Sequence, residues 1–198
     1  MLVINVSKFM QRWAFTILGL IVIIIIILKL LYNYSLAVRT TLQYILMHIP
    51  VIGDIVIYRE VMTFSKTFAS LLSHNVFITD SMNVLNRISR NEIYHQMIRE
   101  TIDNLSHGDK ISTAFKDHWA FPLPAYEMIV TGEKTGQLAE MMKKVANYYQ
   151  SLHKNSVTRV KALVEPIIIV FLTVVVGAIV LAVVIPMFNM YSSVQNYY

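Results

Sequence analysis

Two long apolar stretches lie near the two ends of the 198-residue chain. Residues 14–32 contain a single charged side chain, Lys29, whose aliphatic stem allows its ammonium group to reach the membrane interface. Residues 167–185 contain Thr173 as their single polar side chain. Both stretches are close to the ~20 residues that cross the ~30 Å hydrocarbon core of a bilayer, and neither has a polar face. The pattern therefore predicts transmembrane helices at residues 14–32 and 165–187.

The first stretch also shares features with a secretory signal peptide. Lys8 and Arg12 precede it, and the sequence SLA at residues 35–37 resembles a small-residue cleavage site. However, its apolar run exceeds the ~7–15 residues of a signal peptide, and the bulky side chains of Tyr32 and Tyr34 follow it. We therefore expect the stretch to be retained as a membrane span.

The basic residues predict how the chain is oriented in the membrane. Of 17 Lys and Arg residues, two precede the first span, none follows the second, and 15 lie from Lys29 to Lys161. Cytoplasmic loops carry an excess of basic residues near the ends of membrane spans. We therefore expect the segment between the spans to be cytoplasmic, with residues 1–13 and the tail at residues 188–198 non-cytoplasmic.

Between the spans, residues 55–160 have the apolar spacing of helices. No run alternates strictly between apolar and polar residues, and the Asn-Gly and Asp-Gly dipeptides of tight hairpins do not occur. Apolar residues instead recur at spacings of three and four, and the pattern is interrupted at Gly108 and near Pro124. Thr79 or Asp80 is placed to cap the second helix. The apolar positions of the six predicted helices are Val61, Phe64, Phe68 and Leu71; Met82, Leu85 and Ile88; Ile98, Ile102 and Leu105; Ile111, Ala114 and Phe115; Met128 and Ile129; and Leu138, Met141 or Met142, Val145, Tyr148 or Tyr149, and Leu152.

The connections between these helices are short, which predicts an antiparallel bundle. Residues 33–54 connect the first span to the bundle and are modestly amphipathic. We expect them to form a helix near the membrane surface, followed by a turn at Pro50 and Gly53. The predicted fold class is therefore all-α: an integral membrane protein with two transmembrane helices flanking a six-helix cytoplasmic bundle.

The composition fits this arrangement and excludes some functions. Apolar residues make up 56% of the chain and charged residues 15%, against roughly 45–50% and 25% in soluble domains. The formal charge of +5 does not indicate nucleic-acid binding, because residues 33–161 hold 14 basic and 11 acidic side chains without a basic stripe. The absence of cysteine from the sequence excludes a disulfide or thiolate site.

The sequence TGEKTG at residues 131–136 superficially resembles a phosphate-binding loop. Such a loop has four residues between its glycines, then Lys and Ser or Thr, and it follows a strand. Here three residues separate Gly132 from Gly136, Gln137 comes next, and a predicted helix precedes. We therefore expect a helix–helix corner, or a partner contact, in which the glycines permit unusual backbone conformations or close approach. Glu133 is expected to cap N–H groups at the start of the following helix.

No motif for catalysis or metal binding stands out, and we predict no catalytic residue, metal or cofactor. The six histidines form no i, i+4 pair on a helix, which argues against zinc, and the sequence has no Gly-x-Ser-x-Gly elbow. The helix-borne carboxylates are expected to be solvated, although Glu100 and Asp103 are placed to share a cation weakly. Glu165, directly before Pro166, suits the first turn of a membrane helix. Small residues within 177–182 favour the approach of another helix.

Several motifs, taken in order, resemble one protein family. The chain from Pro50 to about Val194 resembles the GspF/PilC family, the inner-membrane platform proteins of type II secretion and type IV pilus assembly. The motifs are HIPVIGD at residues 48–54, LLSHNVFITDSM at 71–82, LSHGDKISTAF at 105–115, VTGEKTGQLAEMM at 130–142, VEPIIIVF at 164–171 and GAIVLAVVIPMF at 177–188. The positions that the resemblance marks as hallmarks are Pro50, Gly53, Gly108, Gly132, Glu133, Gly136, Glu165, Pro166 and Pro186.

The resemblance implies a fold and a function. Family members usually carry two copies of the cytoplasmic domain and three spans, and this sequence resembles the second copy with two spans. The implied protein is a non-enzymatic scaffold in the bacterial inner membrane. It would couple a cytoplasmic hexameric ATPase to the polymerisation of pilin or pseudopilin subunits.

The resemblance also implies partners, and alternatives stay open beside it. The expected partners are the ATPase, pilin or pseudopilin transmembrane helices, other platform or inner-membrane assembly subunits, the lipid bilayer and a second copy of the chain, without direct nucleic-acid binding. Glu140, Lys143 and Lys144 are candidate contacts to the ATPase. The alternative interpretation of the sequence is a small two-span membrane adaptor or a transporter accessory subunit. A membrane-bound hydrolase requires two carboxylates to converge in the fold.

Overall fold

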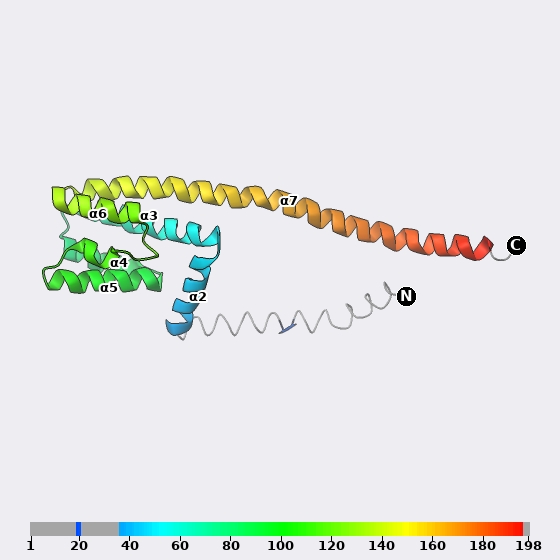
Figure 1. Ribbon diagram of the computed structural model, residues 1–198, viewed down its shortest axis with the longest axis horizontal. Helices are drawn as coiled ribbons and strands as arrows, with labels where there is room; N and C mark the ends of the chain where they lie inside the picture. The colour runs from blue at the N-terminus through cyan, green and yellow to red at the C-terminus, as the bar shows by residue number, and fades with distance from the viewer. Residues whose placement is uncertain (1–18, 21–35, 196–198) are drawn as a thin grey trace. The chain divides into compact units, whose positions relative to one another are not determined.

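The computed structural model describes residues 19, 20 and 36–195 (Figure 1). Residues 1–13 and nearly all of the predicted first span, residues 14–32, lie outside the described residues, as do residues 33–35 and 196–198. The part of the chain that the structure describes contains helices and no strand. This confirms the all-α prediction for the described residues.

One compact unit, Leu31–Arg159, holds most of the helices, and we call it the helical domain. Within it, α4 lies beside α5, and the first part of α7 runs along α6 and α3 (Figure 1). In chain order the elements are α2 (Leu36–His48), α3 (Ile52–Ser73), α4 (Ile78–Ile88), α5 (Glu92–Ser106), the 3-10 helix η1 (Ile111–Phe115), α6 (Leu123–Thr135) and the start of α7 (Leu138–Gln195).

The apolar faces predicted from the sequence meet in one core. Phe115 is fully buried, with its ring centroid 5.2 Å from that of Phe64 and 4.6 Å from that of Phe121. Of the two pairs that the sequence left open on α7, Met142 and Tyr149 are the buried members, whereas Met141 is half-buried and Tyr148 is exposed. The structure thereby selects one residue from each pair that the sequence left open.

The sequence analysis did not single out Tyr94, which is the largest fully buried side chain of the core. Its hydroxyl donates a hydrogen bond of 2.6 Å to the carbonyl of Ala120, in the connection between η1 and α6. Burial without this acceptor would leave a polar group unsatisfied, so the bond fixes the connection against α5. Burial also raises the pKa of Tyr94 well above its usual value.

Helix α4 begins differently from our expectation. The sequence predicted Thr79 or Asp80 as its cap, but α4 begins at Ile78, Phe77 occupies the capping position, and no side chain caps it. Helix α3 ends at Ser73, and Asn75, in the connection to α4, has a φ of 60°, in the left-handed region that Asn tolerates. The chain then resumes the helix two or three residues earlier than predicted, and Asp80 lies in the first turn, where its charge favours the helix dipole.

Helix α7 is a single helix of 58 residues, of which residues 160–195 belong to a second unit. Glu165 and Pro166 therefore lie in its interior, and our expectation that Glu165 lies in the first turn of a helix is wrong. Pro166 has no N–H to donate to the carbonyl of Ala162, so the helix continues with one backbone hydrogen bond fewer at this point.

Large apolar side chains of α7 are exposed throughout residues 163–183. Among the described elements, α7 is the one helix that is long and apolar enough by itself to cross a membrane. The pair α2 and α3 passes the same test only if both count as one span broken by a bend of 111°. Because α3 buries Phe64 and Phe68 in the core, we assign it to the helical domain instead.

Candidate functional site

The glycines of the 132–136 corner end α6 and turn the chain into α7. Gly136 has a φ of 69°, in the left-handed region that glycine adopts without strain. The N–H groups of Gly136 and Gln137 both donate to the carbonyl of Gly132, the second at 3.0 Å. These N–H groups are used within the corner, so the geometry is that of a helix C-terminus and not that of a phosphate cradle.

Gly132 serves a different purpose from Gly136, because it lies where α6 and α7 approach closely. A Cβ atom added to Gly132 would lie 2.8 Å from the Cα of Leu138 and 3.0 Å from its Cδ1. No side chain fits in that space without moving the α7 backbone. The expectation of a helix–helix corner with close approach is therefore confirmed by the geometry.

Glu133 caps a different helix from the one we expected. Its Oε1 accepts hydrogen bonds from the N–H of Ile111 at 2.5 Å and of Ser112 at 3.4 Å, and Oε2 accepts from Ser112 at 3.3 Å. These N–H groups begin η1, so the prediction that Glu133 caps the start of α7 is wrong. The reason is that α6 and η1 pack together, which sequence spacing cannot show. Glu133 thus ties the corner to the segment after the Gly108 turn.

Replacing Glu133 tests this capping role. Glu133→Ala is expected to destabilise the helical domain by about 0.5–2 kcal/mol, because two N–H groups of η1 lose their acceptor. Glu133→Gln keeps a carbonyl oxygen and should lose less. The measurement is urea unfolding of the full chain in detergent, and hydrogen exchange at Ile111 and Ser112 locates the effect. Equal losses for both variants would show that the charge, and not the acceptor, matters.

The Gly108 turn lies beside the same pocket as the corner. Gly108 has a φ of 84°, and its N–H donates to Leu105 while that of Asp109 donates to Asn104, which closes α5 as predicted. An open pocket of 820 Å³ lies between the turn and the corner. Its lysines are Lys110, Lys116 and Lys134, and its wall includes apolar side chains of α4, α5 and α6. Two carboxylates, Asp109 and Glu133, also line the pocket, and that of Glu133 accepts the hydrogen bonds from η1.

Pro50 and Gly53 lie at the bend between α2 and α3, which we call the elbow (residues 49–53). A Cβ on Gly53 would lie 2.2 Å from the carbonyl oxygen of Met47. Val51 has a φ of 72°, a conformation that a β-branched residue rarely adopts. Glycine is therefore required at position 53 by close approach, and the elbow brings Gly53 against Met47 and not against the 132–136 corner.

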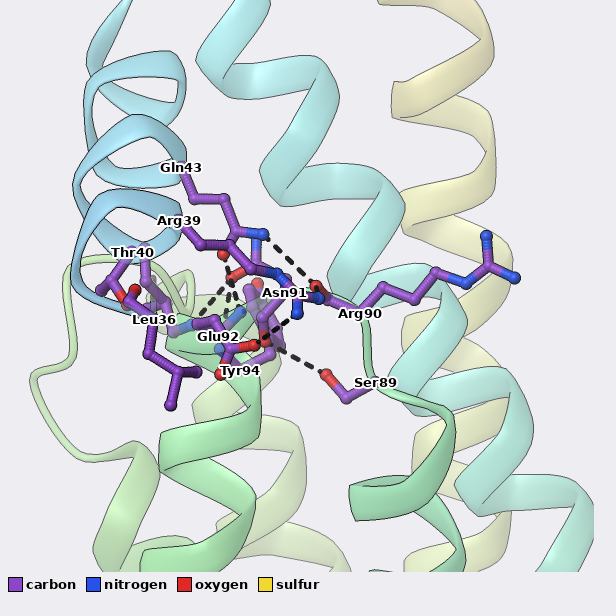
Figure 2. Close-up of polar contacts among 10 residues, drawn as sticks. Leu36, Arg39, Thr40, Gln43, Ser89, Arg90, Asn91, Glu92 and Tyr94 are labelled. Carbon is purple, nitrogen blue, oxygen red and sulfur yellow. Dashed lines mark hydrogen bonds and ion pairs between the residues drawn. The ribbon is translucent and has the colours of Figure 1, made fainter. Parts of the chain in front are cut away.

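A polar network fastens α2 to the start of α5 (Figure 2). Arg39 pairs with Glu92 at 3.0 Å and donates to the carbonyl of Arg90 at 2.8 Å. Gln43 donates to the same carbonyl at 3.3 Å and accepts from the N–H of Glu92 at 2.7 Å. Asn91 caps α5 by accepting from the N–H groups of Ile93 and Tyr94. We call this network the α2 latch.

The sequence analysis missed the latch. Its partners on α2 and α5 are about fifty positions apart, and no local pattern relates them. One signal was available: Arg39, Gln43 and Met47 recur every four residues, which places them on one face of α2. Met47 is buried, so this face is the one that packs on the domain.

The proposed ATPase contacts lie on the exposed side of α7. Glu140 and Lys144 form an ion pair of 2.8 Å at i, i+4 spacing, and Lys143 is exposed beside them. The hydrogen bond and charge of Lys144 lower the pKa of the Glu140 carboxyl. Glu165 and Pro166 lie farther along α7, and Pro186 lies beyond the residues whose side chains are described.

The described residues offer no assembled catalytic or metal centre. In this part of the chain, no group of three or more His, Asp or Glu side chains is placed to hold a metal ion. Among the described side chains, neither Glu100 nor Asp103 forms an ion pair, so the structure does not show them sharing a cation. The recurring features of the molecule are instead helix junctions: the 132–136 corner, the elbow and the α2 latch.

Comparison with known proteins matches most of the chain to one family. The family model described as "Type II secretion system (T2SS), protein F" matches residues 64–186. The type IV pilus assembly protein PilC of Pseudomonas aeruginosa is 28% identical over 189 residues, which are 96% of this chain and 50% of that protein. The protein of the same name from Thermus thermophilus is 30% identical over 152 residues, 76% of this chain and 37% of that protein. The type II secretion system protein F of Vibrio cholerae is 26% identical over 188 residues, 94% of this chain and 46% of that protein.

The chain spans about half the length of the curated relatives that it matches, or less. The family match itself covers more than half of this chain and includes the 132–136 corner, Glu165, Pro166 and Pro186. The chain belongs to the type II secretion system protein F family, among whose relatives are the type IV pilus assembly proteins named PilC.

Proposed function

We propose that this chain is a platform subunit in the bacterial inner membrane, serving a type II secretion or type IV pilus machine. In this role it is a scaffold without enzymatic activity of its own. One observation carries the proposal: in a member of this family, a packed helical domain is followed by a helix whose apolar side chains are exposed over residues 163–183. Such a surface is stable in lipid and costly in water.

The proposed topology has two spans and a cytoplasmic domain between them. Residues 14–32 and 165–187 cross the membrane, and residues 33–54 connect the first span to a six-helix bundle at residues 55–160. Residues 1–13 and 188–198 are non-cytoplasmic. The distribution of Lys and Arg supports this orientation, since 15 of 17 lie from Lys29 to Lys161.

The proposed mechanism is transmission of movement through helix junctions. A hexameric assembly ATPase contacts the exposed face of α7 around Glu140, Lys143 and Lys144, while the spans contact pilin or pseudopilin transmembrane helices. The junctions support this reading because each is fixed by packing or by hydrogen bonds: Gly132 against Leu138, and Arg39 against Glu92. Other platform subunits, or a second copy of the chain, complete the assembly.

Labelling of single cysteines tests the topology. The chain has no cysteine of its own, so each introduced cysteine is the only thiol. Lys143→Cys is expected to react with a membrane-impermeant maleimide only after cells are permeabilised, whereas Ser7→Cys and Ser193→Cys should react in intact cells. Reaction of Lys143→Cys in intact cells would place the helical domain outside and refute the proposal.

The role in assembly is tested by deletion and by purification. Deletion of the gene should abolish pili or secretion, and the chain should co-purify with a hexameric ATPase. Charge reversal of both Lys143 and Lys144 to Glu should weaken that co-purification, while reversal of the exposed Lys110 and Lys116, which lie outside α7, provides a control with the same change of charge. Intact pili and intact secretion after a clean deletion would exclude this function.

A further inference from the structure

Helix α2 has one face that packs on the helical domain and another that is exposed. One face carries Arg39, Gln43 and Met47 and is fastened to the start of α5 by the α2 latch (Figure 2). At 3.6 residues per turn, Thr41, Ile45 and His48 lie on the opposite side of the helix, and Tyr44 lies at the edge of that side. All four are exposed. The latch therefore determines which side of α2 is exposed on the surface of the helical domain.

The outward side continues over the elbow as an apolar surface. We call this surface the elbow patch, and its apolar side chains are each between 37% and 52% exposed: Tyr44, Ile45, Ile49, Val51, Ile52 and Trp119. Trp119, from the connection between η1 and α6, joins the patch through aromatic contacts. Its ring lies 5.2 Å from that of Tyr44 and 4.5 Å from that of His48. An exposed apolar cluster of this kind marks a surface that contacts a membrane or another protein.

The sequence of α2 and the elbow favours a lipid surface as what covers the patch. Residues 36–53 contain one arginine and neither Asp nor Glu, so nothing in this segment repels an anionic lipid surface. Tryptophan and tyrosine are the residues that accumulate at the boundary between lipid headgroups and acyl chains. Residue 36 follows the predicted first span by four positions, which limits its distance from the end of that span to about 14 Å.

We propose that the elbow patch lies on the cytoplasmic surface of the lipid bilayer, with Trp119 and the outward side of α2 at the interface. The inference rests on the proposed function, because it requires the chain to be anchored in a membrane. The inference goes beyond the proposed function because it gives the helical domain a fixed orientation on the bilayer. A helix lying in this plane buries its apolar side at the boundary of headgroups and acyl chains, about 5–10 Å deep.

Fluorescence quenching by brominated lipids tests the proposal. The chain has two tryptophans, so Trp13→Phe leaves Trp119 as the single one. The full chain is reconstituted in vesicles of phosphatidylethanolamine and phosphatidylglycerol, with or without bromine on the upper acyl chain. We expect the brominated lipid to remove roughly half of the Trp119 emission, since the ring lies at interfacial depth. Acrylamide in the aqueous phase should quench it weakly.

A matched control places tryptophan at the other end of the domain. Phe77 follows the far end of α3, whose 22 residues span about 33 Å from the elbow, and its side chain is exposed. In a chain with Trp13→Phe, Trp119→Phe and Phe77→Trp, acrylamide should quench the emission strongly and brominated lipid should not. Equal lipid quenching at residues 77 and 119 would contradict a specific patch.

A third reporter separates this inference from the proposed function. Phe171→Trp, in the chain with Trp13→Phe and Trp119→Phe, reports on the apolar part of α7. Lipid quenching of residue 171 without quenching of Trp119 would overturn the elbow proposal and leave the membrane anchor intact. Trp119 protected from acrylamide but unquenched by lipid would also overturn it, in favour of a protein partner. Absence of quenching at both positions would refute the membrane anchor itself.

Discussion

Phe115→Ala is expected to destabilise the helical domain by about 3–5 kcal/mol, the cost of truncating a buried phenylalanine. Phe115 is fully buried, and its ring contacts those of Phe64 and Phe121 at centroid distances of 5.2 and 4.6 Å. Its position in η1 places it between α3 and the connection to α6. The substitution would therefore leave a cavity where three segments meet, and these segments cannot close it without moving the 3-10 helix.

The same substitution at Phe77 is the matched control. Phe77 is 79% exposed, so Phe77→Ala removes little buried surface and should change stability by at most about 0.5 kcal/mol. Both variants are compared in the full chain by urea unfolding in detergent, followed by near-ultraviolet circular dichroism. If the two variants lose similar stability, the aromatic cluster is not the core of the domain.

The helical domain was predictable because burial in it follows a helical period. Phe64 and Phe68 lie four apart on α3, and both are buried, as are Leu138, Met142 and Val145 on α7. A spacing of three or four needs no knowledge of the partner helix, only of the side that faces inward. The pattern failed at the ends of elements, where Asn75 sets the start of α4 through backbone conformation and not through apolar spacing.

The junctions were predictable only where glycine marks them. Gly132 and Gly136 indicated a corner, because their special backbone and steric properties are visible in the sequence. The partner of Glu133 was not visible: its hydrogen bonds reach η1, more than twenty positions earlier. A carboxylate in the sequence has many possible donors, and the fold selects among them. For the same reason Arg39 and Glu92 gave no sign that they pair.

The features that we propose to contact the membrane show a similar division. The apolar run of α7 was evident from its length alone, since no soluble helix exposes such a surface on all sides. Trp119 was not evident, because it stands in a connection without periodicity, and only the fold brings its ring to Tyr44 and His48. Its contribution to an interface therefore depends on the elbow, which sets the direction of α2.

Gly53→Ala is expected to release α2 from the helical domain. The new Cβ would lie 2.2 Å from the carbonyl oxygen of Met47 and 2.8 Å from its carbonyl carbon. Both atoms belong to the backbone at the end of α2, so no rotation of a side chain relieves the contact. The clash should cost about 1–3 kcal/mol, the range for overpacking. This cost falls on the junction that holds Met47 and the α2 latch in place.

The expected result is local, because the core around Phe115 does not include the elbow. Hydrogen exchange of the full chain should show lost protection in α2 and at the N–H of Glu92, which donates to Gln43 in the latch. The amides of α5 beyond its first turn should keep their protection from hydrogen exchange. The ring of Trp119 should also become accessible to acrylamide, which should quench its emission more strongly, because the ring of Tyr44 moves away.

Gly108→Ala separates steric clash from the general effect of replacing a glycine. Gly108 has a φ of 84° but open space around a new Cβ, so alanine there meets backbone strain of roughly 1 kcal/mol and no neighbour. It should leave the exchange of α2 unchanged. If Gly53→Ala also leaves α2 as protected as in the parent chain, the elbow does not hold α2, and the fixed orientation of the elbow patch loses its structural basis.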